Sequence, residues 1–127
     1  MKIKGISAIT IFTKNMKAAC SFYSRIPTFE LIFGGESSDF STFQVSNSPK
    51  MYLNLELSLD HSGCYFGRII FHTGDVDALF SHLKNDKIIS NLAKFETEPT
   101  DAPWNERFFH IRDPDGYQLS FATPLSN

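Results

Sequence analysis

The chain has 127 residues, of which 42% are hydrophobic and 20% charged, and its formal net charge is −2. This length suits one domain with a substantial core, and the mixed charge without a basic run argues against nucleic acid as a partner. No apolar stretch approaches the roughly 18 residues of a membrane span, so no membrane association is expected. The first residues lack the apolar run of a secretory signal, which predicts a cytoplasmic protein.

The numbers of phenylalanine and cysteine residues bear on the core and on covalent or metal cross-links. Phenylalanine occurs 13 times, which predicts either an aromatic core or a cavity lined with rings. The two cysteines, Cys20 and Cys64, fall in a predicted helix and a predicted linker and form no CxxC pair. Neither a disulfide framework nor a zinc site is therefore expected.

The first half of the chain predicts one strand, one helix and three further strands. Asn15 is a suitable N-cap for a helix from Met16 to Arg25, which Pro27 would end. Alternating or β-rich segments bounded by turns predict the strands, over residues 3–12, 29–34, 40–46 and 51–59.

The second half repeats the opening pattern after a polar linker at residues 60–66, so the modules are residues 1–59 and 67–127 of a single domain. Residues 68–73 predict a strand, Asp75 a cap, and Val76 to about Asn85 a helix. Residues 88–96 are expected to contain a strand of uncertain ends. A loop at residues 99–103 and Trp104 precede the last two strands.

Those last strands, within residues 108–121, are joined by Asp113-Pro114-Asp115-Gly116. Pro114 favours the first central position of a turn, Asp113 can bond back to the turn backbone, and Gly116 suits a left-handed conformation.

An internal repeat organises the fold. A shift of 60 positions places Thr13 on Thr73 and the cap Asn15 on Asp75. The repeat predicts an α+β fold of two βαβββ modules, whose mostly antiparallel sheets curl around a shared cavity.

With this repeat, the Phe22-Tyr23 pair in the first helix and the Asp113-Pro114-Asp115-Gly116 turn, the chain resembles the vicinal oxygen chelate superfamily. This is the group of glyoxalases, bleomycin resistance proteins and extradiol dioxygenases. The resemblance covers almost the whole chain, and it implies a small-molecule cavity, usually within a homodimer.

The resemblance also implies where a divalent metal would bind: one position on the first strand and one on the last strand of each module. The first-strand positions are Ala8 and Arg68, and the second module's last strand offers Ser120. The first module's last strand offers Glu56 or Asn54, depending on register. Because alanine has no donor atom and arginine repels a metal ion, we expect neither metal nor other cofactor, as in the metal-free bleomycin-resistance-like branch.

Several polar residues are candidates for a ligand site. Arg68 and His72 lie four apart on one strand and so share a face. Arg68 either meets an anionic group of a ligand or forms an ion pair with Glu56, and both interpretations stay open. His72 and His110 are more often structural than catalytic, and the facing of His110 is undetermined.

Aromatic residues offer a second kind of contact. Trp104 is either a stacking wall for a flat ligand or a lid, and Asn105 follows it where similar proteins often carry glycine. The strand phenylalanines are either core or cavity lining, and they are Phe12, Phe40, Phe43, Phe66, Phe108 and Phe121.

The sequence thus favours a protein that binds a small, partly aromatic molecule in a metal-independent cavity, with no catalytic residue assigned. The alternatives are a metal-dependent lyase or dioxygenase of the same superfamily with a displaced metal site, and a structural or regulatory dimer with a filled cavity. The expected ligand-binding residues are Arg68, His72, Glu56, Trp104, Phe12 and Ser120.

Overall fold

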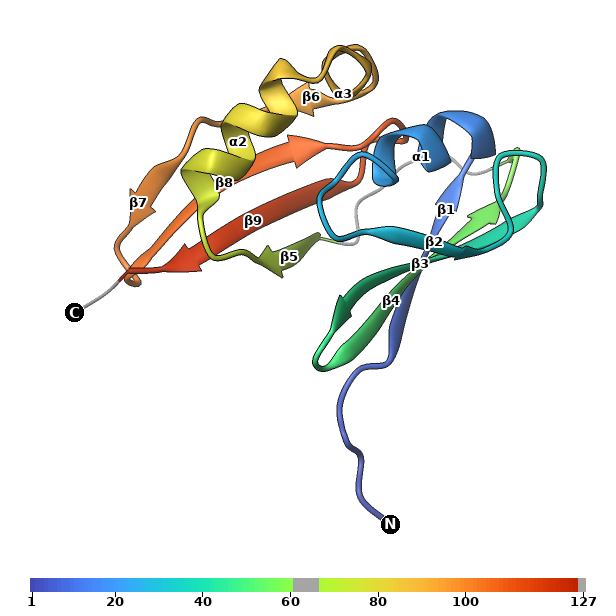
Figure 1. The fold of residues 1–127 in the computed structure, drawn as a ribbon, viewed down its shortest axis with the longest axis horizontal. Coiled ribbons are helices and arrows are strands. Elements are labelled where there is room, and N and C mark those ends of the chain that lie inside the picture. Colours follow the sequence, from blue (N-terminus) through green and yellow to red (C-terminus); the bar gives the residue numbers. More distant parts are fainter. Residues whose placement is uncertain (61–66, 126–127) are drawn as a thin grey trace. The chain divides into compact units, whose positions relative to one another are not determined.

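The computed structural model describes residues 1–60 and 67–125, and the chain forms two compact units, Met1–Ser62 and Gly63–Asn127. The predicted linker at residues 60–66 falls almost entirely outside the described residues. Each unit contains one mixed sheet with helices on one face (Figure 1). The predicted α+β class is therefore confirmed.

The first unit has the order strand, helix, and three strands. Its sheet has the strand order β1-β4-β3-β2, with β1 and β4 parallel and the other neighbours antiparallel. The elements are β1 (Ala8–Thr13), α1 (Met16–Tyr23), β2 (Glu30–Phe33), β3 (Phe40–Asn47) and β4 (Lys50–Leu57). β1 begins five residues later than predicted, and residues 1–7 precede it without regular structure (Figure 1).

The second unit repeats this plan with additions. Its main sheet order is β5-β9-β8-β6, with β5 and β9 parallel, and β7 pairs with the edge of β8. The elements are β5 (Arg68–His72), α2 (Val76–Asn85), α3 (Lys87–Leu92), β6 (Lys94–Phe95), β7 (Thr100–Ala102), β8 (Glu106–Arg112) and β9 (Gln118–Pro124).

The strand expected within residues 88–96 is present, but it is much shorter than the segment. Most of residues 88–96 form the short helix α3, and only Lys94–Phe95 pair as a strand. The reason is the cap: Asp86 Oδ1 accepts hydrogen bonds from Ile88 N at 2.9 Å and Ile89 N at 3.1 Å. This cap outweighs the β preference of the two isoleucines.

The caps of α1 and α2 show the repeat at atomic detail. Asn15 Oδ1 accepts from Ala18 N, and Asp75 Oδ1 accepts from Ala78 N, each at 3.0 Å. Both predicted N-caps are confirmed. Each relieves one of the unsatisfied N–H groups at a helix start.

The two cores are built mainly from rings. In the first unit Tyr23 of α1 lies 6.2 Å from Phe43 of β3, centroid to centroid, and both are fully buried. In the second unit Phe80 of α2 lies 5.2 Å from Phe109, which lies 5.3 Å from Phe121. Burial of such rings is the main stabilising contribution.

Cys20 lies within the first core, on α1. Its Sγ donates to Ser41 Oγ at 3.7 Å, and Gly35 N donates to the same hydroxyl at 2.9 Å. Burial raises the pKa of the Cys20 thiol, with a smaller contribution from Glu36, against the lowering effect of the Ser41 hydrogen bond. Cys20 is a free thiol, and Cys64 lies outside the described residues.

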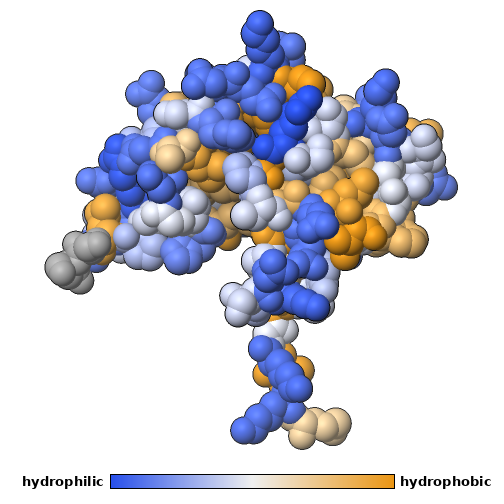
Figure 2. Space-filling model, in the orientation of Figure 1, coloured by the Kyte–Doolittle hydropathy of each residue, from blue (hydrophilic) through white to orange (hydrophobic). Residues whose placement is uncertain are grey.

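β2 forms an exposed edge of the first sheet. Leu31, Ile32 and Phe33 are 41%, 49% and 63% exposed. A hydrophobic area covers the part of the surface where β2 lies (Figure 2). Such an edge offers both apolar surface and unpaired backbone groups.

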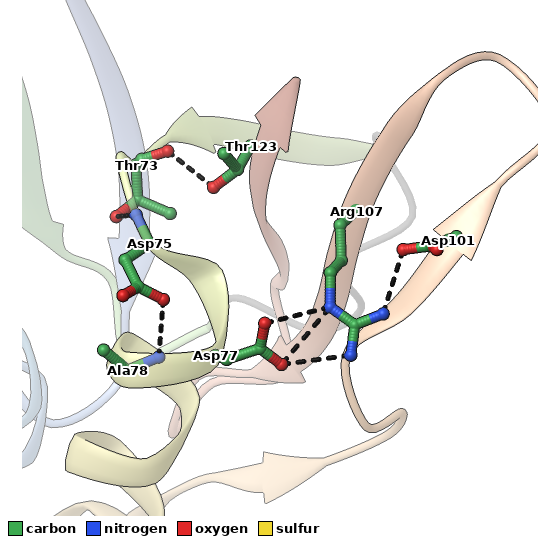
Figure 3. A network of polar contacts seen from close by, with 7 residues as sticks. All are labelled: Thr73, Asp75, Asp77, Ala78, Asp101, Arg107 and Thr123. Carbon is green, nitrogen blue, oxygen red and sulfur yellow. Dashed lines mark hydrogen bonds and ion pairs between the residues drawn. The ribbon is translucent and has the colours of Figure 1, made fainter. Parts of the chain in front are cut away.

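A polar network ties α2 to the sheet of the second unit. The Arg107 guanidinium of β8 contacts Asp77, in the first turn of α2, at 3.0 Å and Asp101 of β7 at 2.9 Å (Figure 3). These carboxylates raise the pKa of Arg107 further, so the guanidinium links three elements as a permanent cation.

The terminal turn forms as predicted. Asp113 is buried, and its Oδ1 accepts from Asp115 N and Tyr117 N, both at 2.9 Å. Gly116 has φ 94°, the left-handed conformation that glycine adopts readily. None of the helices that the structure describes is long and apolar enough to cross a membrane.

Candidate functional site

The candidate site is the face of the second sheet that the unit's own helices leave uncovered, named here the second open face. Pairing across β8, β9 and β5 arranges its side chains in three rows. The rows are Phe108–Ala122–His72, His110–Ser120–Ile70 and Arg112–Gln118–Arg68.

The last row carries a chain of polar contacts. Arg68 Nε donates to Gln118 Oε1 at 2.8 Å, and Gln118 Nε2 donates to Glu96 Oε1 at 2.9 Å. Arg112 Nε forms an ion pair with the same Glu96 oxygen at 3.0 Å, and its Nη1 donates to Gly116 O at 3.0 Å. Glu96 therefore accepts hydrogen bonds from two members of this row, Gln118 and Arg112.

The two arginines of this row differ in how their positive charge is balanced. Burial works to raise the pKa of Glu96, but hydrogen bonds from Gln118 and Arg112 hold it below its ordinary value. The ionised Glu96 neutralises Arg112 directly, whereas Arg68 reaches it only through the neutral amide of Gln118. Among the described residues, the Arg68 guanidinium has no other hydrogen bond and no ion pair.

His110 occupies the middle row beside this charge. Its Nδ1 is buried and has no hydrogen-bond partner among the described residues. Burial, followed by the nearby Arg68 and Arg112, lowers the pKa of His110, and Glu96 opposes that effect only in part. The imidazole is therefore neutral at pH 7, and its unpartnered Nδ1 points into the unit rather than toward solvent.

Rings continue from His110 along the same side of β8. The centroid of Phe108 lies 4.8 Å from that of His110 and 6.0 Å from that of Trp104, whose plane is 22° from that of Phe108. We name these three residues the ring ladder. Trp104 is 65% exposed, and its Nε1 donates to Glu106 Oε1 at 3.1 Å.

Asn105 supplies the turn that places Trp104. Its φ is 69°, the left-handed conformation that asparagine tolerates better than most residues. Its Nδ2 also donates to Leu125 O at 3.3 Å. Asparagine therefore gives this loop the backbone that a glycine would give.

The uncovered face of the first sheet, the first open face, has different chemistry. Thr42 Oγ1 donates to Asn54 Oδ1 at 2.7 Å, and Asn54 Nδ2 donates to Thr10 Oγ1 at 3.2 Å. Phe12 and Glu56 face each other across β1 and β4 beside this chain. Phe12 is 37% exposed.

The register decides which residues stand at the positions where the resemblance implies a metal. Arg68 pairs with Gln118, two residues before Ser120, and Ala8 pairs with Tyr52, two residues before Asn54. Asn54, not Glu56, is therefore the counterpart of Ser120. The amide of Asn54 already bonds two threonines.

These residues do not fit a metal ion. Alanine and arginine offer no ligand atom, and one amide with one hydroxyl is far from the donor set of a divalent cation. Among the described residues, no three His, Cys, Asp or Glu side chains lie together as a metal site requires.

The predicted site residues divide between the units. Arg68, His72, Ser120 and Trp104 belong to the second open face, whereas Phe12 and Glu56 belong to the first. The ion pair between Arg68 and Glu56 would join the two units and stays a prediction. Of the strand phenylalanines, Phe43 and Phe121 are core, and Phe66 lies outside the described residues.

Sequence reasoning missed two residues that shape the site, Gln118 and Glu96. Gln118 could have been found, because it lies two positions from Ser120 and so shares its face. Glu96 could not, since its position depends on the unpredicted helix α3 and the short strand β6.

The family model of the Glyoxalase/Bleomycin resistance protein/Dioxygenase superfamily matches residues 5–121. The chain belongs to this superfamily. The match includes every predicted site residue. No curated protein matches the chain.

Several solved structures share the fold. A glyoxalase/bleomycin resistance protein/dioxygenase family enzyme from Burkholderia phytofirmans PsJN is 20% identical, with a TM-score of 0.73 over 94% of this chain and 98% of that chain. The fosfomycin resistance protein FosX from Listeria monocytogenes is 17% identical, with a TM-score of 0.75 over 96% and 94%. TioX from Micromonospora sp. ML1 is 16% identical, with a TM-score of 0.70 over 95% and 99%.

Proposed function

We propose that this superfamily member binds a small, partly aromatic molecule on the second open face without a metal ion. The observation that carries the proposal is the row arrangement itself. It brings the ring ladder and the Arg68 guanidinium to one face of one sheet. A flat ligand can stack on rings while polar groups fix its orientation.

The donor set supports metal independence. The residues at the implied positions are Ala8, Asn54, Arg68 and Ser120, and Arg68 would repel a cation at close range. Sequestering a molecule requires only affinity, so such a protein can function without the ligands that an enzyme of the superfamily would need. No catalytic residue is proposed.

A thermal-shift screen of chemically diverse small molecules tests binding. A ligand at about 100 times its dissociation constant should raise the free energy of unfolding by about 2.7 kcal/mol. Trp104→Ala should reduce that gain with only a small loss of stability in the ligand-free protein, because Trp104 is mostly exposed. A library without any stabilising compound would count against the proposal and favour the structural-dimer alternative.

Elemental analysis of protein purified without chelator or affinity-tag metal tests metal independence. We expect no stoichiometric Mn, Fe, Co, Ni or Zn. About one metal ion per chain would instead favour the enzyme alternative with a displaced site. Glu56→Gln would then be expected to remove the ion, while Glu30→Gln, on β2 of the same unit, would serve as the control.

A cytoplasmic homodimer is also proposed. Its support is the superfamily resemblance together with the exposed apolar edge of β2 at Leu31, Ile32 and Phe33. Light scattering at several concentrations should give twice the chain mass of 14.4 kDa, and Phe33→Lys should shift the mass toward the monomer if this edge is the interface.

A further inference from the structure

The structure also indicates what class of molecule the second open face selects. We propose that the ligand is an aromatic organic anion, whose carboxylate or similar group is bound by Arg68 while its ring stacks on the ring ladder. This inference rests on the proposed function and narrows its ligand.

The charge argument begins with the row Arg112–Gln118–Arg68. Glu96 accepts hydrogen bonds from Arg112 and Gln118 and so neutralises Arg112 locally. Arg68 contacts only the neutral amide, through Nε, which leaves both Nη groups available among the described residues. A guanidinium with a free edge is suited to bind a carboxylate through two parallel hydrogen bonds.

Gln118 gives this arginine a defined orientation. Its Oε1 accepts from Arg68 Nε while its Nε2 is held by Glu96. Since both ends of the amide are engaged, the hydrogen bond from Arg68 Nε favours one orientation of the guanidinium before a ligand arrives. Preorganisation of this kind lowers the entropic cost of binding.

The ring argument uses the same side of the sheet. His110 lies one row from Arg68 and follows Phe108 and Trp104 in the ring ladder. Because burial lowers the pKa of His110, the imidazole is neutral at pH 7 and adds a flat surface without a second positive charge. The ring ladder therefore runs along β8 from the exposed indole of Trp104 toward the row that contains Arg68.

A cationic or neutral ligand fits this arrangement less well. A cation stacked on the ring ladder would be repelled by the positive charge of Arg68. A neutral ligand would leave the guanidinium without a counter-charge. The second open face therefore discriminates by charge as well as by shape.

The test compares three probes by NMR titration: benzoate, benzamide and cyclohexanecarboxylate. Benzoate should bind about tenfold more tightly than benzamide, which lacks the charge, and several-fold more tightly than cyclohexanecarboxylate, which lacks the ring. The backbone amides that shift should belong to β5, β8 and β9.

Two variants assign the selectivity. Arg68→Gln should abolish the preference for benzoate over benzamide, and His110→Leu should abolish the preference for benzoate over cyclohexanecarboxylate, because His110 is the member of the ring ladder nearest Arg68. Lys87→Gln, on α3, removes the same charge elsewhere and should change neither preference. An unchanged amide spectrum outside the site shows that each variant is folded.

Equal affinity for benzoate and benzamide, or a preference that survives Arg68→Gln, would overturn the inference. Absence of binding by all three probes would overturn it as well. The proposed function would still stand if the thermal-shift screen identified a cationic or neutral ligand on the second open face, so the two failures are distinguishable.

Discussion

Asp113 shows how much one side chain can do for a turn. Its Oδ1 accepts two backbone hydrogen bonds within the turn while the residue is only 4% exposed. Asp113→Ala should lower the free energy of unfolding by about 2 kcal/mol or more, because two N–H groups lose their acceptor. Urea denaturation measures this loss.

Asp113→Asn is the matched control, since its amide oxygen can accept the same bonds. It should retain most of the stability that alanine loses. Equal losses in both variants would mean that the charge of Asp113, not its hydrogen bonds, stabilises the turn.

His110 predicts a pH dependence. Its pKa in the folded protein is below the ordinary 6.5, chiefly because of burial. The unfolded chain therefore binds the proton more readily than the folded protein does. Protonation of His110 in the unfolded chain lowers the free energy of unfolding as the pH falls below about 6.5, and this loss is absent at higher pH. His110→Phe should reduce the loss of stability between about pH 7 and pH 5.

Urea midpoints over that pH range measure the effect of His110→Phe. His82→Gln, on the exposed side of α2, should leave the original pH slope in place. A slope that is identical in wild type and His110→Phe would contradict the assignment. Because Nδ1 has no partner, His110→Phe should not lower stability at pH 8.

Arg107 acts between elements. It joins α2 to β8 and β7 through Asp77 and Asp101 (Figure 3). Arg107→Leu should lower the melting temperature, and the loss should be smaller in 1 M salt than in 0.05 M salt, because salt screens partly exposed charges. Differential scanning calorimetry measures both values.

Lys17→Gln, on the exposed side of α1, is the control for that loss and should change the melting temperature little at either salt concentration. A salt-independent loss in Arg107→Leu would show that packing of the arginine stem, not its charge, connects the elements.

Element types were predictable from sequence wherever local signals agreed. Asn15 and Asp75 capped the two long helices as expected, because an N-cap requires only a side chain three residues from its partner. The strand expected within residues 88–96 forms only at Lys94–Phe95, because Asp86 favours a helix start where the isoleucines favour a strand. Which signal wins depends on packing around Ile89, which is fully buried and which sequence alone does not place.

The candidate site was predictable to a lesser extent. Alternation put Arg68 and His72 on one face, but the facing of His110 required the pairing of β8 with β9. The choice between Asn54 and Glu56 likewise required the pairing of β1 with β4. A register shift of one or two residues changes which side chains meet, and sequence patterns do not fix pairing that closely.

The predicted ion pair between Arg68 and Glu56 can be tested by a double-mutant cycle. If the pair forms, the combined variant Arg68→Gln with Glu56→Gln should be more stable than the sum of the single losses implies, by at least 0.5 kcal/mol. Urea denaturation at two protein concentrations measures this coupling and distinguishes pairing within a chain from pairing between copies.

Additive losses would argue against the pair and leave Arg68 available to a ligand. Arg68→Gln combined with Glu30→Gln, on β2, provides the control cycle, for which additivity is expected.

The rate at which the Cys20 thiol is modified can report how fast the core of the first unit opens. Its thiol is buried and its pKa is raised, so an aromatic disulfide reagent can modify it quickly only when that core opens. The chain's one tryptophan, Trp104, lies in the second unit. In a Cys64→Ser variant, the thiol modification rate and the tryptophan emission therefore report on separate halves of the chain. We expect the modification rate to match the global unfolding rate, whereas faster modification would show that the first half opens while the second remains folded.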